Sequence, residues 1–185
     1  REHFATKAPI LIAEKCGTVA AVERAIEQAV RSHGVQIVAV DYAQLIRGNG
    51  DNKEQRVGDV STRLKNAAIR HDIIVLLLAQ LNRGIESRDD AEPQLADLRD
   101  SGSLENDADV ALFPYWPWMI DNRYGENAER GIPPNRKEYR IYQRKNRNRG
   151  IGANECLMAR IEPDRQRIVI SEEREVDDSE VPNNF

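Results

Sequence analysis

Short apolar runs alternate with stretches of helical periodicity in the first half of the chain. The uninterrupted apolar runs predict β-strands at residues 8–14, 35–40 and 73–80. Between these runs, apolar residues recur every three or four positions and predict helices at residues 18–33 and 54–72. Strands that are apolar throughout and alternate with helices indicate an α/β fold, with a mostly parallel sheet and helices on both faces.

The first predicted helix has clear ends and one apolar face. Thr18 is a suitable N-cap residue, and Gly34 is a typical stop signal after the last turn. The apolar face consists of Val19, Val22, Ile26 and Val30. We expect this face to lie in the core rather than at a surface for a partner.

The second half of the chain is more polar and ends in predicted strands. Residues 81–109 form a long polar stretch. Alternating apolar residues then predict strands at residues 110–116 and 138–146. A C-terminal hairpin is expected at residues 154–163 and 165–171.

Charge is distributed unevenly along the chain, although the net charge is only -4. Residues 136–149 contain seven Lys or Arg and one Glu, whereas residues 172–180 contain six acids and one Arg. The basic segment is suited to contact with phosphates. The acidic segment predicts a disordered tail at residues 171–185.

Size and composition narrow the class of protein. A chain of 185 residues, 40% of them hydrophobic, is long enough for one domain with a substantial core. The longest apolar run, residues 73–79, is far shorter than the roughly 20 residues needed to cross a bilayer. Cys16 and Cys156 are too few for a disulfide framework. These features predict a cytoplasmic protein that does not enter a membrane.

Polar residues follow the predicted strands at positions where parallel sheets bind ligands. Asp41 comes directly after the apolar run that ends at Val40, and Gln80 ends the next run. A strand-end carboxylate can coordinate Mg²⁺, as in a Walker B segment, and a strand-end Gln can orient a water or contact a γ-phosphate. An Asp that caps the next turn and a polar residue that leaves the core remain open as alternatives.

Two further segments could contact phosphates. Small residues stand beside one arginine in the first segment, which contains Arg99, Ser101, Gly102 and Ser103. Basic residues crowd around glycines in the second, which contains Arg144, Lys145, Arg147 and Arg149. The second could contact nucleic acid or a neighbouring subunit's nucleotide. An ordinary polar loop and a solvated basic turn are the alternatives.

Three aromatic residues, Tyr115, Trp116 and Trp118, lie close together in the sequence. Aromatic side chains can stack on the bases of single-stranded nucleic acid. They can equally fill the edge of a core, and we favour that second interpretation here.

Together these segments resemble one family, the DnaB-type replicative DNA helicases, whose motor is a RecA-like ATPase domain. The resemblance covers roughly residues 8–168. It is carried by the stretches IVAVDYAQLI, KEQRVGDVSTRLKNAAIRHDIIVLLLAQLNRGIESR, DLRDSGSLENDADVALF and KNRNRGIG. It implies a RecA-like P-loop NTPase core, of which residues 1–170 would form a part.

The resemblance also implies an activity and its partners. Members form a hexameric ring that moves along single-stranded DNA, driven by ATP hydrolysis between subunits. We therefore expect ATP and Mg²⁺ as cofactors, single-stranded DNA and further copies of the chain as partners, and primase and a helicase loader as additional partners.

Individual residues take roles from this resemblance. Asp41 corresponds to the Walker B ligand of Mg²⁺, and Gln80 to the sensor that couples the γ-phosphate to the DNA loops. Lys145 and Arg147 correspond to the basic pair that reaches the neighbouring subunit's ATP. The DNA loop that grips the DNA backbone corresponds to Arg99, Asp100 and Gly102.

The sequence departs from the family pattern at three places. It contains no GxxxxGK[ST], so we expect a motor domain truncated on its N-terminal side. Such a piece would hydrolyse ATP poorly and would be monomeric or weakly associated. Arg149 and Gly150 stand where Gly and Pro are common, and Asp100 stands where Glu is more frequent.

Two other functions remain open. The same RecA-like fold could serve a recombination-type ATPase. A chain without the phosphate-binding loop could also be a degenerate subunit that binds DNA or regulates a ring without hydrolysing ATP.

Overall fold

The structure is a computed structural model. It describes residues 10–82, 84–85, 88, 92–119, 136–147, 155–165 and 167–170, with only the backbone of residues 99–101. The chain divides into two compact units, Arg1–Asn82 with Ala96–Ala108 and Arg83–Leu95 with Asp109–Phe185. The tail expected at residues 171–185 lies outside the described residues.

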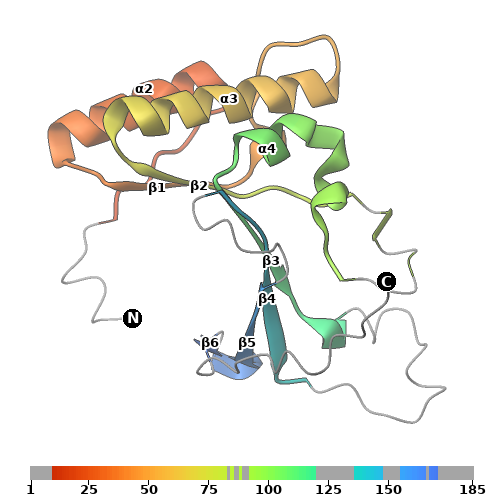
Figure 1. Ribbon diagram of the computed structural model, residues 1–185. Helices are drawn as coiled ribbons and strands as arrows, with labels where there is room; N and C mark the ends of the chain where they lie inside the picture. The colour runs from red at the N-terminus through yellow and green to blue at the C-terminus, as the bar shows by residue number, and fades with distance from the viewer. Residues whose placement is uncertain are drawn as a thin grey trace. The chain divides into compact units, whose positions relative to one another are not determined.

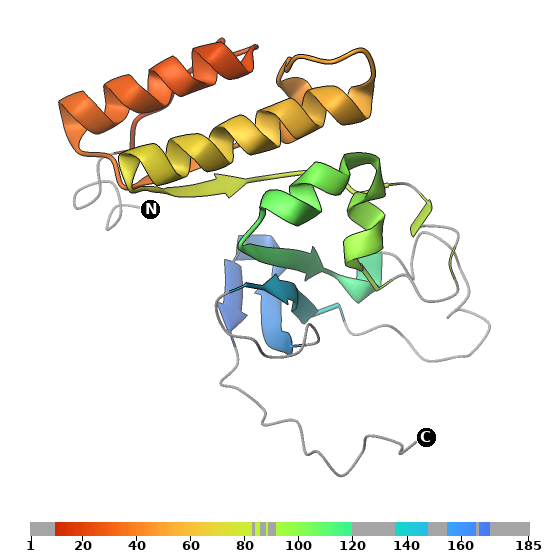
Figure 2. The same cartoon turned by 45° about the horizontal axis from the view of Figure 1, so that its top comes forward.

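In the first unit, two helices lie side by side on one face of a pair of parallel strands (Figures 1 and 2). The helices are α2 (Val19–His33) and α3 (Lys53–His71). The strands are β1 (Ile37–Val40) and β2 (Ile74–Leu77), which pair in parallel with Val40 opposite Leu77. A 3-10 helix, η1 (Ala43–Leu45), follows β1. The predicted strand–helix alternation is confirmed from residue 18 onward.

Local capping explains where the two helices begin and end. The Thr18 hydroxyl accepts a hydrogen bond from the Ala21 N–H at 3.2 Å, and Gly34 adopts a left-handed φ of 63°. In α3, the Asn52 side chain accepts from the Gln55 N–H at 2.8 Å, and Asp72 ends the helix with a φ of 51°. The N-cap and the stop signal predicted for the first helix are both confirmed.

The core of this unit lies between the helices and the covered face of the sheet. Its central side chains are Val60 and Leu64 of α3, which are 0% and 1% exposed. Val19, Val22 and Ile26 of α2 are buried against them, so the apolar face expected on this helix does lie in the core. Each such side chain contributes about 1.5–3 kcal/mol through burial.

The opposite face of the same strands is apolar and exposed. Ile37 of β1 is 58% exposed, and Ile74 and Leu76 of β2 are 57% and 53% exposed. Leu78, just beyond β2, is 47% exposed. Within the described part of the chain, helices therefore cover one face of the β1–β2 pair and not both.

The strand predicted at residues 8–14 is wrong for the five described positions, 10–14, which form no strand. Ile10 and Ile12 are 76% and 83% exposed. A β-strand is stable only beside a hydrogen-bonding neighbour, and this segment joins neither of the sheets formed by the described residues. Apolar composition alone was therefore an insufficient signal.

Part of the polar stretch at residues 81–109 is helical, which the sequence pattern did not predict. It contains the 3-10 helix η3 (Leu95–Ser101) and the short helix α4 (Gly102–Asp107). Leu104 of α4 is buried beside Ala43 and Val57, and this contact fixes α4 to α3. Because α4 has a single buried leucine among polar residues, its sequence shows no apolar periodicity that would predict a helix.

The second unit contains an antiparallel sheet in the order β3–β4–β5–β6. Its strands are β3 (Val110–Tyr115), β4 (Glu138–Asn146), β5 (Glu155–Glu162) and β6 (Arg167–Ile170). The predicted strands and the C-terminal hairpin are confirmed. The expectation of mostly parallel strands fits the first unit only. In the second unit, the β4–β5 and β5–β6 connections are too short for the crossover that parallel pairing needs.

Candidate nucleotide and nucleic-acid sites

Asp41 and Gln80 leave the sheet at the same edge. Asp41 directly follows β1, and Gln80 lies three residues after β2. Because these strands run in parallel, their carboxyl ends meet on one side. Asp41 is exposed, the peptide bond between it and Tyr42 is cis, and none of the described cationic side chains pairs with Asp41. The sequence prediction that these two residues converge at one edge agrees with this geometry.

The side chain of Gln44, in η1, holds the main chain of Gln80. Gln44 Nε2 donates to the Gln80 carbonyl at 3.1 Å, and the Gln80 N–H donates to Gln44 Oε1 at 3.1 Å. Both main-chain groups of Gln80 are thus satisfied by one amide. Sequence reasoning passed over Gln44, since the residue it contacts lies 36 positions away.

A small cavity adjoins this contact. It has a volume of about 40 Å³ and is lined by Gln44, Lys53, Gln80, Leu81, Asn82, Asp97 and Leu98. A water needs roughly 10–15 Å³ of such space, whereas ligand pockets span roughly 300–1,000 Å³. The cavity therefore suits a few waters and is too small for a nucleotide.

The candidate DNA segment begins directly after Asp97 and Leu98, two residues that line this cavity. Arg99 and Asp100 lie in η3, with side chains outside the described part of the structure, and Gly102 begins α4. A Cβ built on Gly102 would meet no atom within 4 Å, so the backbone there is open to approach. The far end of α4 is fixed to α3 by a 2.9 Å hydrogen bond from the Thr62 hydroxyl to Asp107.

The candidate basic pair lies at the end of β4. Lys145 stands opposite Ala111 of β3. The N–H of Arg147 donates to the Asp109 carbonyl at 2.7 Å, and its guanidinium lies 3.4 Å from the Asp109 carboxylate. Arg149 lies outside the described residues. The side chains of this ion pair are half-exposed, 49% for Arg147 and 44% for Asp109. The ion pair therefore holds the Arg147 side chain without burying it.

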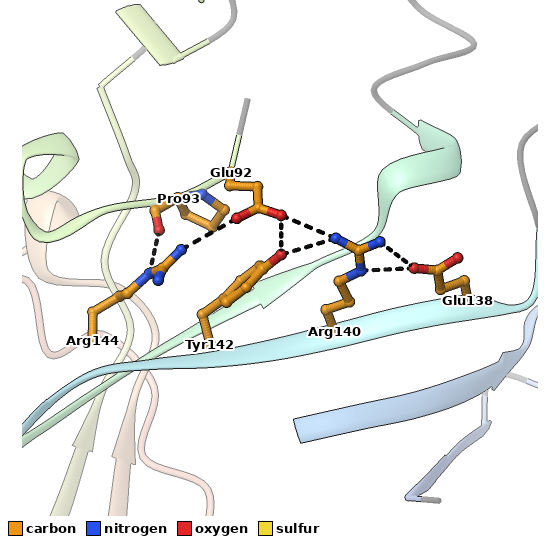
Figure 3. Close-up of polar contacts among 6 residues, drawn as sticks. All are labelled: Glu92, Pro93, Glu138, Arg140, Tyr142 and Arg144. Carbon is orange, nitrogen blue, oxygen red and sulfur yellow. Dashed lines mark hydrogen bonds and ion pairs between the residues drawn. The ribbon is translucent and has the colours of Figure 1, made fainter. Parts of the chain in front are cut away.

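One carboxylate, that of Glu92, joins three side chains of β4 (Figure 3). Glu92 accepts from Arg140 at 3.0 Å and from the Tyr142 hydroxyl, and lies 3.5 Å from Arg144. Arg144 also donates to the Pro93 carbonyl at 2.9 Å. Its guanidinium lies 4.3 Å from the centre of the Tyr142 ring, a cation–π distance. These contacts fix residues 92 and 93 to β4, the strand that carries Lys145.

Burial and these partners shift the pKa values of the cluster. Burial raises the pKa of Tyr142, and the hydrogen bond to Glu92 raises it further. Burial alone would lower the pKa of Arg140, but its contacts with Tyr142 and Glu138 outweigh burial and raise it. Burial also raises the pKa of the Cys156 thiol. Tyr142 therefore remains a neutral donor and Arg140 a cation.

The aromatic residues contact their own chain. The rings of Trp116 and Trp118 lie 5.2 Å apart, and the Arg136 guanidinium lies 5.2 Å from the centre of the Trp118 ring. Trp116 donates its indole N–H to the Arg136 carbonyl at 3.1 Å. These contacts agree with the interpretation that the two tryptophans pack at the edge of the second unit.

The described residues contain neither a cluster of metal-binding side chains nor a membrane-spanning helix. No group of three or more side chains suited to a metal occurs among them. No helix among them has the length and apolar character needed to cross a membrane. Mg²⁺ is commonly held by one or two carboxylates together with substrate phosphates and waters, so this finding does not bear on the role expected for Asp41.

Comparison with known families decides the class of protein. The family described as "DnaB-like helicase C terminal domain" matches residues 2–160. The chain belongs to this family. The RecA-like fold class expected from the sequence agrees with this membership, and the resemblance noted in the four sequence stretches is confirmed.

Relatives with known names and structures agree. The chain is 34% identical over 152 residues to the replicative DNA helicase DnaC of Bacillus subtilis (strain 168), covering 80% of this chain and 31% of that protein. It is 41% identical over 93 residues to DnaB of Helicobacter pylori (strain J99 / ATCC 700824), covering 49% of this chain and 19% of that protein. The chain thus spans about a third or less of these relatives.

Two solved structures share the fold. One is described as an ATPase domain, with a TM-score of 0.71 and 28% identity, covering 84% of this chain and 52% of that one. The other is a DnaB-like replicative helicase described with its interactions with primase. Its TM-score is 0.68 with 27% identity, covering 82% of this chain and 35% of that one. These likenesses confirm the RecA-like fold class.

Proposed function

We propose that this chain is the part of a replicative DNA helicase motor that joins ATP hydrolysis to movement along single-stranded DNA. The observation that carries the proposal is the parallel pairing of β1 with β2, which brings Asp41 and Gln80 to one edge of the sheet. Membership of the DnaB-like helicase family supports it.

The residues at this edge fit a nucleotide bound with Mg²⁺. The exposed Asp41 carboxylate would hold Mg²⁺, and the Gln80 side chain would contact the γ-phosphate or its attacking water. Bound Mg²⁺–ATP supplies the phosphoryl group and part of the charge neutralisation. Lys145 and Arg147 would reach the nucleotide of a neighbouring copy, where cations stabilise the transition-state charge.

The phosphate cradle is the part that this sequence does not supply. It contains no GxxxxGK[ST], and the cavity beside Gln80 is too small for a nucleotide. The chain by itself is therefore expected to hydrolyse ATP poorly, so the activity has to be measured in the full-length protein.

The DNA contact would come from the segment that follows the Gln80 edge. Arg99, Asp100 and Gly102 would contact the sugar–phosphate backbone of the DNA. Such contacts do not depend on the base sequence. The open space at Gly102 supports close approach of a strand. In the proposed assembly, six copies form a ring around single-stranded DNA. One structural relative is described with its interactions with primase, which supports primase as a partner, and a helicase loader completes the proposed set.

The decisive experiment measures ATP hydrolysis with and without single-stranded DNA, and unwinding of a forked duplex, in the full-length protein. Asp41→Asn should abolish turnover. Gln80→Ala should keep nucleotide binding and lose the stimulation by DNA. A matched control is Asp164→Asn, an exposed aspartate in the 3-10 helix η4 (Pro163–Arg165), which should behave as wild type.

The outcomes separate the candidate functions. Full turnover in Asp41→Asn would contradict the proposed Mg²⁺ ligand. A wild-type protein that binds single-stranded DNA without hydrolysing ATP would instead be a non-hydrolysing ring subunit, the alternative that a chain without GxxxxGK[ST] leaves open. DNA-stimulated turnover without unwinding would favour a recombination-type ATPase.

A further inference from the structure

Gln44 occupies the place of a missing strand residue beside β2. The parallel ladder continues past the strand ends, because the Leu78 N–H donates to the Val40 carbonyl at 3.0 Å and the Ala43 N–H donates to the Leu78 carbonyl at 2.9 Å. Beyond that point the chain turns into η1, so its main chain no longer runs beside β2. Gln80, two residues further on, has no main-chain neighbour from β1.

The Gln44 amide takes over that pairing. A primary amide carries one carbonyl acceptor and an N–H donor, the same two groups as a peptide unit. Gln44 uses both on one residue, with two 3.1 Å contacts to the N–H and carbonyl of Gln80. Two such contacts fix both the position of the Gln80 backbone and its rotation.

The same stretch of chain is fixed again two residues later. The Asn82 N–H donates to the Asp97 carbonyl at 3.0 Å, and Asp97 is only 8% exposed. Asp97 lies in η3, two residues before Arg99. The stretch from Gln80 to Asn82 is therefore hydrogen-bonded at one end to Gln44, after Asp41, and at the other end to the segment that carries the candidate DNA residues.

We propose that Gln44 is a positioning residue for Gln80, holding the main chain from which the Gln80 side chain reaches the nucleotide. This inference rests on the proposed role of Gln80. Gln44 itself touches no reacting group. Its effect comes from geometry, since a shift of about 1 Å in a catalytic group can cost on the order of 10²-fold in rate.

The test uses double-mutant analysis in the full-length protein. Gln44→Met keeps the length of the side chain and removes both polar contacts. Gln44→Glu keeps an acceptor for the Gln80 N–H but places a carboxylate against its carbonyl. Each variant is combined with Gln80→Ala, and kcat and KM for ATP are measured at saturating single-stranded DNA. Gln28→Met, on the exposed side of α2, is the matched control and should be unchanged.

Positioning predicts a specific pattern. Either Gln44 variant should lower the DNA-stimulated kcat by up to roughly 10²-fold, with a smaller change in KM. Adding it to Gln80→Ala should cause no further loss, because the side chain that it positions is already gone. A melting temperature above the assay temperature shows that a Gln44 variant is folded during the assay. The kcat of each Gln44 variant that meets this condition then tests the inference.

Two results would overturn the inference. One is a DNA-stimulated kcat equal to wild type in the folded Gln44 variants. The other is losses that multiply in the double variants, which would show that Gln44 acts independently of Gln80. Failure of the proposed function itself is recognised separately, because the wild-type protein would then show no DNA-stimulated ATP hydrolysis.

Discussion

Gly58 of α3 and Ser103 of α4 approach so closely that a Cβ built on Gly58 would lie 2.7 Å from Ser103 Oγ and 3.3 Å from Ser103 Cβ. This contact explains a glycine in the middle of a helix, where alanine would otherwise be favoured by about 1 kcal/mol. Gly58 thus sets how closely the helix after the candidate DNA segment can lie against α3.

Gly58→Ala should lower stability by about 1–3 kcal/mol, because the added methyl overpacks this contact. It should also weaken binding to single-stranded DNA, since α4 follows directly on residues 99–101. Ser103→Ala in the same chain removes the nearer atom and should restore most of the loss. Gly17→Ala is the control, because a Cβ there meets no atom within 4 Å. Equal melting temperatures for Gly58→Ala and Gly17→Ala would count against this packing.

Glu92 is predicted to contribute more to the free energy of unfolding than an exposed carboxylate in a surface ion pair. Glu92→Gln leaves Arg140 and Arg144 without their shared anion and should cost about 1–3 kcal/mol. Glu27 pairs with Arg31 at 2.8 Å on the surface of α2, and Glu27→Gln should cost only about 0–1 kcal/mol. Denaturant unfolding measures both. Similar losses from the two substitutions would contradict the bridging role of Glu92.

Stability at alkaline pH should depend on Tyr142. Its pKa is raised in the folded state, so above the ordinary tyrosine value of about 10 the folded chain holds a proton that the unfolded chain releases. The stabilisation is fully present below about pH 10 and is lost as pH rises toward the folded pKa. Unfolding free energies from about pH 8 to 11 should therefore fall more steeply for wild type than for Tyr142→Phe. Parallel pH profiles would refute the raised pKa.

The basic pair at the end of β4 is predicted to act on ATP turnover rather than on folding. Lys145→Ala and Arg147→Ala should each reduce ATP hydrolysis by roughly 10³–10⁵-fold in the full-length protein, while nucleotide binding largely remains. Arg160→Ala is the control, because Arg160 also forms an ion pair at the surface, 3.2 Å from Glu162, and its loss should leave turnover unchanged. Normal turnover in the Lys145 and Arg147 variants would exclude the proposed role of this pair at a neighbouring copy's ATP.

Features set by neighbouring residues could be predicted from the sequence. The cap at Thr18 and the left-handed Gly34 depend on contacts within a few positions, and the alternating pattern of residues 138–146 predicts the bounds of β4. The family resemblance added the site residues, because its motifs are long and specific. Of these, the structure brings Asp41 and Gln80 to one edge, whereas the roles themselves remain predictions.

Features set by distant residues could not be predicted in this way. Residues 10–14 have the composition of a strand but join neither sheet in the described part of the chain. Gln44 and Gln80 meet across 36 positions, and Glu92 meets Arg140 across 48. No local pattern marks such partners, since each side chain by itself looks like an ordinary surface residue.

The apolar face of β1 and β2 has a thermal consequence. Apolar surface associates more strongly on warming and less strongly on cooling, and Ile37, Ile74 and Leu76 each expose more than half of their surface. The chain is expected to be monomeric or weakly associated, and any self-association through this face should therefore depend on temperature. Concentrated solutions of it should turn turbid when warmed and clear again when chilled, so cold, dilute storage is the condition that suits it.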